Sequence, residues 1–407
     1  MVHQTITNKM TNANNASKIK PLMHTLLWPA CSKKRALALL LIVGSLAGCG
    51  LMTSAPTQSS TEPSSAASPG IDAPLPPPIL QAKSRWVAAP WSDLPGWSQD
   101  ALQEAWSAWQ YSCQRASASA GSVCADVTRL NGAALSAQQQ WLKQRFQPYR
   151  VETLQGASDG LLTGYFEPVM DASRLPRPGF AVPLYGVPSS LGQRKPWFTR
   201  EEMESQAQAR AALKGKELVC LADPGDAMVL HIQGSGRIRV TEADGRVRTV
   251  RLAFAGTNDH PYKSIGSWLL EQGLTRDATW PGIKAWIAKN PQRVNELLWK
   301  NPRVVFFKEE SLAGAAADLG PKGAQGVPLS AGRSIAVDPG SIPYGTPVWL
   351  ASSGPQAQLQ KLVLAQDTGS AIVGGVRADY FAGSGQAAGE LAGRLKQPLR
   401  LWVLWPR

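Results

Sequence analysis

Histidine and cysteine are scarce in this sequence, and their scarcity limits the chemistry that the chain can carry out. Among 407 residues there are four His and five Cys, and the only histidines beyond residue 49 are His231 and His260. None of these residues follows the spacing of a zinc site, in which Cys and His recur in closely spaced pairs. We therefore expect neither a metal centre nor a cofactor.

The N-terminal region lacks a hydrophobic run of membrane-spanning length. Its apolar segment, Ala36 to Gly48, has 13 residues, whereas a spanning helix needs about 20. The basic cluster Lys33 to Arg35 directly before it is typical of a signal peptide. The segment runs into Leu46 to Cys49, which resembles the bacterial lipoprotein box. We expect residues 1–48 to be a signal peptide and Cys49 to be lipidated, the alternative being an ordinary secretory signal with an incidental Cys.

Acidic residues are absent from residues 1–49, and this absence inflates the net charge. The whole chain has 42 Lys and Arg against 29 Asp and Glu, a formal charge of +13, but six of the basic residues lie in that acid-free segment. The remainder therefore carries +7. A mildly basic body suits an anionic polymer or a membrane surface, and an ordinary soluble protein fits equally well. We do not expect nucleic acid as a partner.

Cysteine usage agrees with export from the cytoplasm. Cys31 and Cys49 belong to the signal region, and Cys113 and Cys124 bracket a loop rich in Ser, Ala and Gly. In an oxidising compartment these two could be bridged, or both could stay free. Cys220 is expected to be a free, buried thiol.

The composition divides the chain into a tether and a globular part. Residues 49–84 are rich in Ser, Thr and Pro, which favours an extended tether that holds the folded part away from a membrane. Apolar periodicity and capping signals predict helices after Ser98, over 137–146, after Thr199, over 264–272 and 280–289, and after Asn290. Alternating or apolar runs predict strands over 161–166, 182–185, 227–233, 237–241, 246–253, 304–307, 334–337, 346–350, 362–365 and 399–404.

Three aspartates gather in the block from Ser334 to Tyr380. Asp338 follows the first predicted strand of the block, Asp367 ends a later one, and Asp379 closes a Gly-rich loop. Strand ends and loops present side chains to ligands. Each aspartate has an alternative interpretation as a turn cap, which the Asp-Pro-Gly context of Asp338 favours.

This block resembles the three-aspartate domain at the C-terminus of the membrane-bound lytic murein transglycosylase A family. The resemblance extends through Thr163 to Pro168, Asp226 to Arg237, His260 to Gly266, and Asn301 to Phe307. It implies a mainly β, α+β fold: a double-psi β-barrel main domain of residues 85–166 and 258–407. A second small β-barrel, residues 167–257, would be inserted into it, with a substrate groove between the two.

The resemblance also implies an activity, cleavage of the β-1,4 bond between N-acetylmuramic acid and N-acetylglucosamine in peptidoglycan glycan strands. Lytic transglycosylases use one acid/base residue and leave 1,6-anhydromuramoyl ends. The family places this residue in Arg-Ala-Asp-Tyr, which is Asp379 here, with support from Asp367 and Asp338. A single acid must be protonated near neutral pH, and neighbouring carboxylates together with burial raise a pKa in that direction.

Further residues are implied to bind the glycan. They are Gln233, Gly234, Ser235 and Gly236, together with Asp226, Tyr165 and Glu167. Without the resemblance, Gly-Ser-Gly is only a hairpin turn and Asp226 could equally cap a strand. The family often has a second Tyr where Phe166 stands.

Two other functions remain open at this point. Three carboxylates could hold a hard cation in a metal-dependent polysaccharide hydrolase, or the barrel could belong to a peptidoglycan-binding lipoprotein without activity. With Gly50 rather than Asp after Cys49, as is usual in outer-membrane lipoproteins, we expect a lipid anchor on the periplasmic face of the outer membrane. Cell-wall synthesis or division proteins would be its protein partners.

Overall fold

The computed structural model describes residues 75–115 and 121–407. The expected signal peptide, Cys49 and most of the expected tether lie outside the described residues. Within the described residues, no helix is both long enough and apolar enough to pass through a lipid bilayer.

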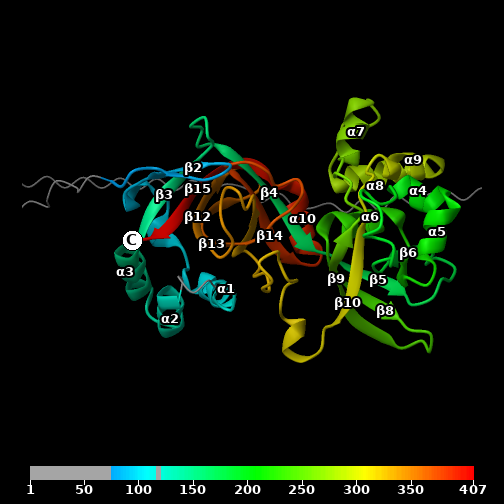
Figure 1. Cartoon of the computed structure of the whole chain (residues 1–407), viewed down its shortest axis with the longest axis horizontal. Coiled ribbons are helices and arrows are strands. Elements are labelled where there is room, and N and C mark those ends of the chain that lie inside the picture. Colours follow the sequence, from blue (N-terminus) through cyan, green and yellow to red (C-terminus); the bar gives the residue numbers. More distant parts are fainter. Residues whose placement is uncertain (1–74, 116–120) are drawn as a thin grey trace, which may run out of the picture. The chain divides into compact units, whose positions relative to one another are not determined.

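The first sheet closes on itself. Its order is β1-β2-β3-β15-β12-β13-β11-β14-β4, and β15 pairs with β4 as well as with β12. Six strands from β15 to β4 therefore form a barrel (Figure 1), with parallel pairs β11–β13 and β14–β4. The strands are β1 (Ile79–Leu80), β2 (Arg85–Ala88), β3 (Phe146–Glu152), β4 (Gly160–Glu167), β11 (Ser334–Val337), β12 (Pro347–Ser353), β13 (Gln358–Asp367), β14 (Arg377–Ser384) and β15 (Lys396–Pro406). This arrangement confirms the predicted barrel fold.

The barrel strands are apolar on both faces because both faces are covered. On β13, Val363 and Ala365 face the barrel core, whereas Leu362 and Leu364 belong to a second core on the outside. Successive residues of a strand point to opposite faces, so a strand buried on both sides reads as a continuous apolar run.

Three helices cover that outer core. They are α1 (Gln103–Cys113), α2 (Gly121–Arg129) and α3 (Leu135–Arg145), and a disulfide between Cys113 and Cys124 links α1 to α2. Trp106 and Trp109 of α1 pack against Trp141 of α3. The predicted cap was wrong. Ser98 lies in the short 3-10 helix η2 (Trp97–Gln99), and the N-cap position of α1 is Leu102, whose side chain makes no capping bond.

The second sheet has the order β10-β9-β8-β5-β7-β6 and is nearly closed, because Gly186, just after β6, bridges to Phe307 on β10. Its strands are β5 (Val169–Ser173), β6 (Val182–Tyr185), β7 (Glu217–Leu221), β8 (Gly236–Thr241), β9 (Val247–Thr257) and β10 (Val305–Ser311). The pairing of β10 with β9 argues for a later border of the inserted domain than residue 257. The division of the chain into a main and an inserted domain stays a prediction.

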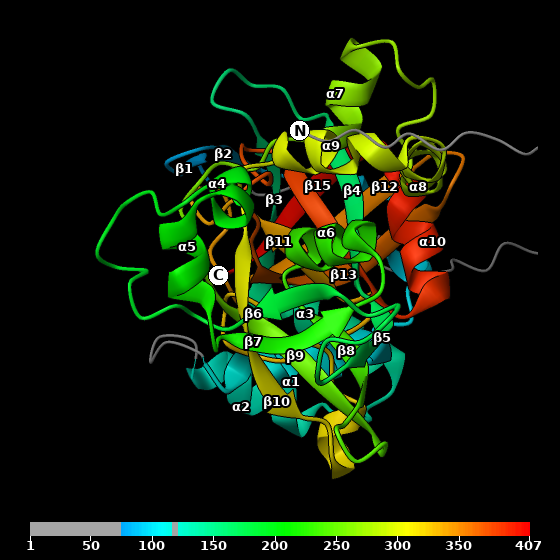
Figure 2. The same ribbon diagram turned by 90° about the vertical axis from the view of Figure 1, so that its right-hand side faces the viewer.

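The predicted strand over 227–233 is wrong, because this segment belongs to helix α6 (Pro224–Gln233), which packs on the second sheet (Figure 2). Asp223 caps the helix by accepting from the amide of Gly225, Pro224 takes the first helical position, and Gly234 ends the helix in a left-handed conformation. These are the usual start and stop signals of a helix. A short, mostly apolar run does not by itself distinguish a buried helix from a strand.

The remaining helices are α4 (Arg200–Ser205), α5 (Ala207–Leu213), α7 (Ile265–Glu271), α8 (Trp280–Lys289), α9 (Val294–Trp299) and α10 (Gln386–Arg394). The capping box predicted at Thr199 is present, with reciprocal bonds to Glu202. Free Cys220 is buried, as expected.

Candidate active site

Two of the three aspartates flank the same point of strand β11. Asp367 on β13 and Asp379 on β14 are both paired with Ala336 of β11. Residues directly opposite one another in a sheet share a face. The barrel thus brings the two carboxyl groups to one side of the sheet.

Asp379 is half-buried and strongly perturbed. Burial raises the pKa of Asp379 to about 6, and the negative charge of Asp367 adds to the rise. Two groups act in the opposite direction: the hydroxyl of Thr163, which donates to Asp379 Oδ1 over 2.5 Å, and the guanidinium of Arg377. A carboxyl group with this pKa is partly protonated near neutral pH, which a general acid requires.

Asp367 is held by donors from two other segments. Its Oδ2 accepts from the hydroxyl of Tyr165 and its Oδ1 from the amide of Ala324, each over 2.9 Å. Burial raises the pKa of Asp367. Burial and the charge of Asp367 also raise the pKa of Tyr165 well above its usual value, so the phenol stays a donor.

A cleft of about 430 Å³ opens beside this pair. Asp367 and Tyr165 line it on the barrel side, and the segment Gln233 to Ser235 lines it from α6. Asp379 is not among the lining residues. It pairs with Thr163, two residues before Tyr165 on β4, and so lies next to the cleft wall.

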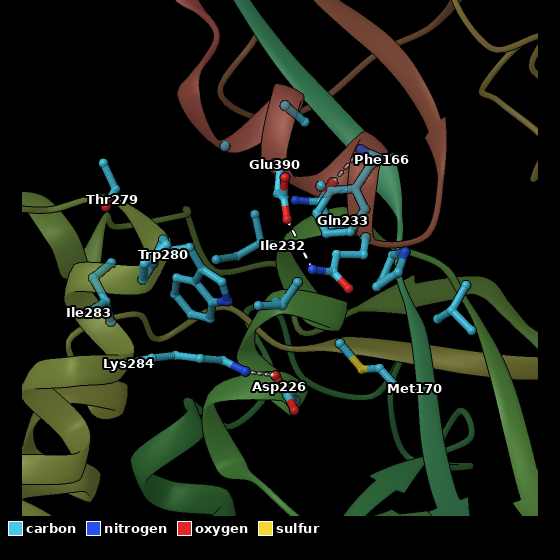
Figure 3. A pocket seen from close by; sticks show the side chains of 18 of the residues that line it. Phe166, Met170, Asp226, Ile232, Gln233, Thr279, Trp280, Ile283, Lys284 and Glu390 are labelled. Atoms are coloured by element: carbon cyan, nitrogen blue, oxygen red, sulfur yellow. Dashed lines mark hydrogen bonds and ion pairs between the residues drawn. The ribbon is translucent and has the colours of Figure 1, made fainter. Parts of the chain in front are cut away.

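A larger groove of about 1150 Å³ continues from the cleft. Phe166, Ile232 and Gln233 line both, and the amide of Phe166 donates to Gln233 Oε1 over 3.0 Å. Figure 3 shows that Trp280 and Lys284 of α8 face this groove, with Lys284 ion-paired to Asp226. Asp226 therefore lies in the groove, in the first turn of α6 rather than before a strand.

The Gly-Ser-Gly motif is a helix end rather than a hairpin turn. Gly234 is the C-cap residue of α6, and Ser235 is buried. A Cβ at Gly236 would lie 2.3 Å from a methyl of the buried Leu230, so a larger residue here would have to displace that side chain. Of the expected glycan-binding residues Gln233 to Gly236, the first three line the cleft.

Two of the expected binding residues are engaged within the protein. Asp338 accepts from the amides of Gly340 and Gly374, which is the turn-cap alternative. Glu167 is fully buried, and its carboxylate accepts from Arg237, Arg251 and Ser384. Glu167 is therefore closed to a ligand, whereas the partly exposed Asp338 is engaged in its own turn.

Several residues at the site were not found from the sequence. Thr163 and Tyr165 are two positions apart on β4 and therefore point to the same face of the sheet, so the alternation along this strand could have indicated Thr163 as a site residue. Phe254 in the cleft and Trp280 in the groove carry no signal beyond being aromatic. Across residues 75–115 and 121–407, no group of three or more His, Cys, Asp or Glu side chains is placed to hold a metal ion.

A closed barrel that holds two half-buried aspartates with raised pKa values beside a cleft has the features of an enzyme that uses acid–base catalysis. Family models match the chain as "MltA specific insert domain" over residues 161–308 and as "3D domain" over 333–405. The chain therefore belongs to the lytic murein transglycosylase A family.

Individual relatives agree with this assignment. A solved lytic transglycosylase of Burkholderia pseudomallei, LtgG, is 43% identical, with 81% of this chain and 97% of that chain covered and a TM-score of 0.55. A solved Neisseria gonorrhoeae family member is 29% identical, covers 83% and 96%, and has a TM-score of 0.67. The membrane-bound lytic murein transglycosylase A of Vibrio cholerae is 34% identical over 60% of this chain. The match spans 65% of that relative's length.

Proposed function

We propose that this protein is a lytic transglycosylase that cleaves the β-1,4 bond between N-acetylmuramic acid and N-acetylglucosamine in peptidoglycan. The observation that carries the proposal is the half-buried carboxyl group of Asp379, whose pKa is raised to about 6 beside Asp367 and an open cleft. A family member from Escherichia coli, 25% identical, was solved with bound chitohexaose, which supports a glycan as the ligand.

The reaction needs one carboxyl group used twice. Protonated Asp379 gives its proton to the glycosidic oxygen, and the bond from that oxygen to C1 of the muramoyl sugar breaks. The resulting carboxylate then takes the proton of the same sugar's C6 hydroxyl, whose oxygen bonds to C1. No water is consumed, and the product is a 1,6-anhydromuramoyl end.

The surrounding residues have separate tasks in this scheme. The negative charge of Asp367 disfavours ionisation of Asp379, and Tyr165 fixes Asp367 by donating to it. Gln233, Gly234 and Ser235 line the cleft, and their polar groups suit the hydroxyl and acetamido groups of a glycan. The remaining sugars of the bound glycan would lie in the groove beside helix α8.

The products of the purified enzyme test the proposal. Mass analysis of fragments released from purified peptidoglycan should give anhydro ends, which are one water lighter than reducing ends. Reducing ends would indicate a hydrolase, and loss of activity with a chelator would indicate a metal-dependent one. Retention of peptidoglycan without any release would indicate a binding protein.

We also propose a lipid anchor at Cys49, which lies outside the described residues. The curated relatives are named membrane-bound, and the lipoprotein box supports an anchor on the periplasmic face of the outer membrane. Cys49→Ser should shift the protein from the membrane fraction to the soluble fraction or leave it uncleaved, because the acyl chains on this residue supply the whole membrane attachment. Unchanged outer-membrane fractionation of this variant, beside wild type and Cys220→Ser as controls, would contradict the anchor.

A further inference from the structure

Thr163 lies between a cation and the acid. Arg377 Nη2 donates to Thr163 Oγ1 over 2.8 Å, and Thr163 Oγ1 donates to Asp379 Oδ1 over 2.5 Å. A guanidinium has only donors, so the threonine oxygen must accept from it. A threonine hydroxyl carries one proton, and that proton is then directed to Asp379.

The geometry of this chain is fixed by two barrel strands. Arg377 on β14 also donates through Nη1 to the backbone carbonyls of Ala378, over 2.5 Å, and Leu161, over 3.3 Å, and so bridges β14 and β4. The parallel register places Thr163 directly opposite Asp379. Neither Arg377 nor Thr163 depends on a loop for its position.

We infer that Thr163 is a positioning residue for the acid. By donating to Oδ1 it keeps the carboxylic-acid proton of Asp379 on Oδ2, the oxygen left for the glycosidic oxygen of the substrate. This inference rests on the proposed function, because it concerns the same reaction. Without Thr163, the proton would be shared between the two oxygens, and part of the enzyme would hold it on the wrong one.

The charges around Asp379 determine how the loss of Thr163 would be observed. The titratable groups that face it are Arg377 on its own strand, Asp367 on β13 and Tyr165 on β4. The hydroxyl of Thr163 stabilises the ionised form. Its removal therefore raises the pKa of Asp379 above about 6 and moves the alkaline limb of the kcat profile to higher pH.

Thr163→Val tests the inference, because valine keeps the β-branched shape that suits a strand and lacks only the hydroxyl. We expect the maximum of kcat over pH to fall roughly ten- to a hundredfold, as for the loss of one hydrogen bond to a charged group. KM should stay close to that of wild type, and the alkaline limb of the kcat profile should move to higher pH. Thr163→Ser, the matched control, keeps the hydroxyl and should therefore have the wild-type kcat and the wild-type position of the alkaline limb.

Two results together would overturn the inference: the alkaline limb of Thr163→Val stays at the wild-type pH, and Thr163→Ser is as slow as the valine variant. Thr163 would then have a structural role only. If the valine variant does not fold, Thr163→Ala decides by the same two criteria, again with Thr163→Ser as the control. Anhydro ends from the wild type are scored separately. Their absence would count against the proposed function, whereas their presence with an unshifted variant counts only against the role of Thr163.

Discussion

Asp379→Asn is expected to lower kcat by about 10²–10⁴, the range that general acid–base catalysis contributes. The amide keeps the shape of the carboxyl group and can still accept from Thr163, but it has no acidic proton for the glycosidic oxygen. Binding of the glycan should survive, since the cleft residues Gln233 and Ser235 are untouched. Release of anhydro ends and retention of peptidoglycan by the same variant measure the two effects separately.

Asp367→Asn serves as the matched comparison, because it removes a neighbouring carboxylate rather than the acid. Loss of that negative charge should lower the pKa of Asp379 from about 6 and move the alkaline limb to lower pH. The expected result is a shifted profile with residual activity. Only Asp367 lines the cleft directly, so the reverse outcome is informative. A nearly normal Asp379→Asn together with an inactive, unshifted Asp367→Asn would exchange the two roles.

Glu167→Gln should destabilise the fold by about 3–5 kcal/mol, the cost of removing one partner from a buried ion pair. Glu167 is fully buried, and the side chain of Arg251 opposite it is only 6% exposed. Arg237 and Arg251 also donate to the backbone carbonyls of Ala317 and Leu319. With glutamine, two guanidinium groups would stay in this site without a negative charge.

Thermal or denaturant unfolding of the full chain measures this effect. Asp171→Asn is the control, because Asp171 also forms an ion pair with an arginine, Arg239 on the neighbouring strand, but both side chains are more than half exposed. Exposed pairs contribute about 0–1 kcal/mol. Equal, small losses for the two variants would show that the buried cluster is not an important source of stability.

The sequence predicted those elements whose signals are local. The helix over 280–289 has the predicted bounds, because Thr279 caps it and Pro281 lies in its first turn. Five of the six barrel strands were predicted, because apolar runs flanked by Gly and Pro are short enough to be strands. Strand β14 was missed, and Asp379, which was expected to close a loop, lies within this strand. Helix α6 was missed because its apolar run was interpreted without the preceding Asp223, which is the N-cap residue of the helix.

The site was predicted less completely than the fold, since its members depend on register. Asp367 and Asp379 were found through the family motif, and their common partner Ala336 appears only once the strands are paired. The burial of Glu167 depends on two arginines that lie 70 and 84 residues away along the chain. Nothing near Glu167 in the sequence distinguishes a buried ion pair from a glycan contact.

The parallel pairing of β4 with β14 also has a consequence for the order of folding. Thr163 and Asp379 are 216 residues apart, and Tyr165 and Asp367 are 202 apart. Contacts of such large sequence separation form slowly, because the closing of a long loop must precede them. A chain that emerges with its N-terminus first presents β4 long before its partner strands exist. The site around Asp379 is therefore assembled only after nearly the whole polypeptide has been made, and an N-terminal fragment that ends before β14 lacks Asp379 altogether.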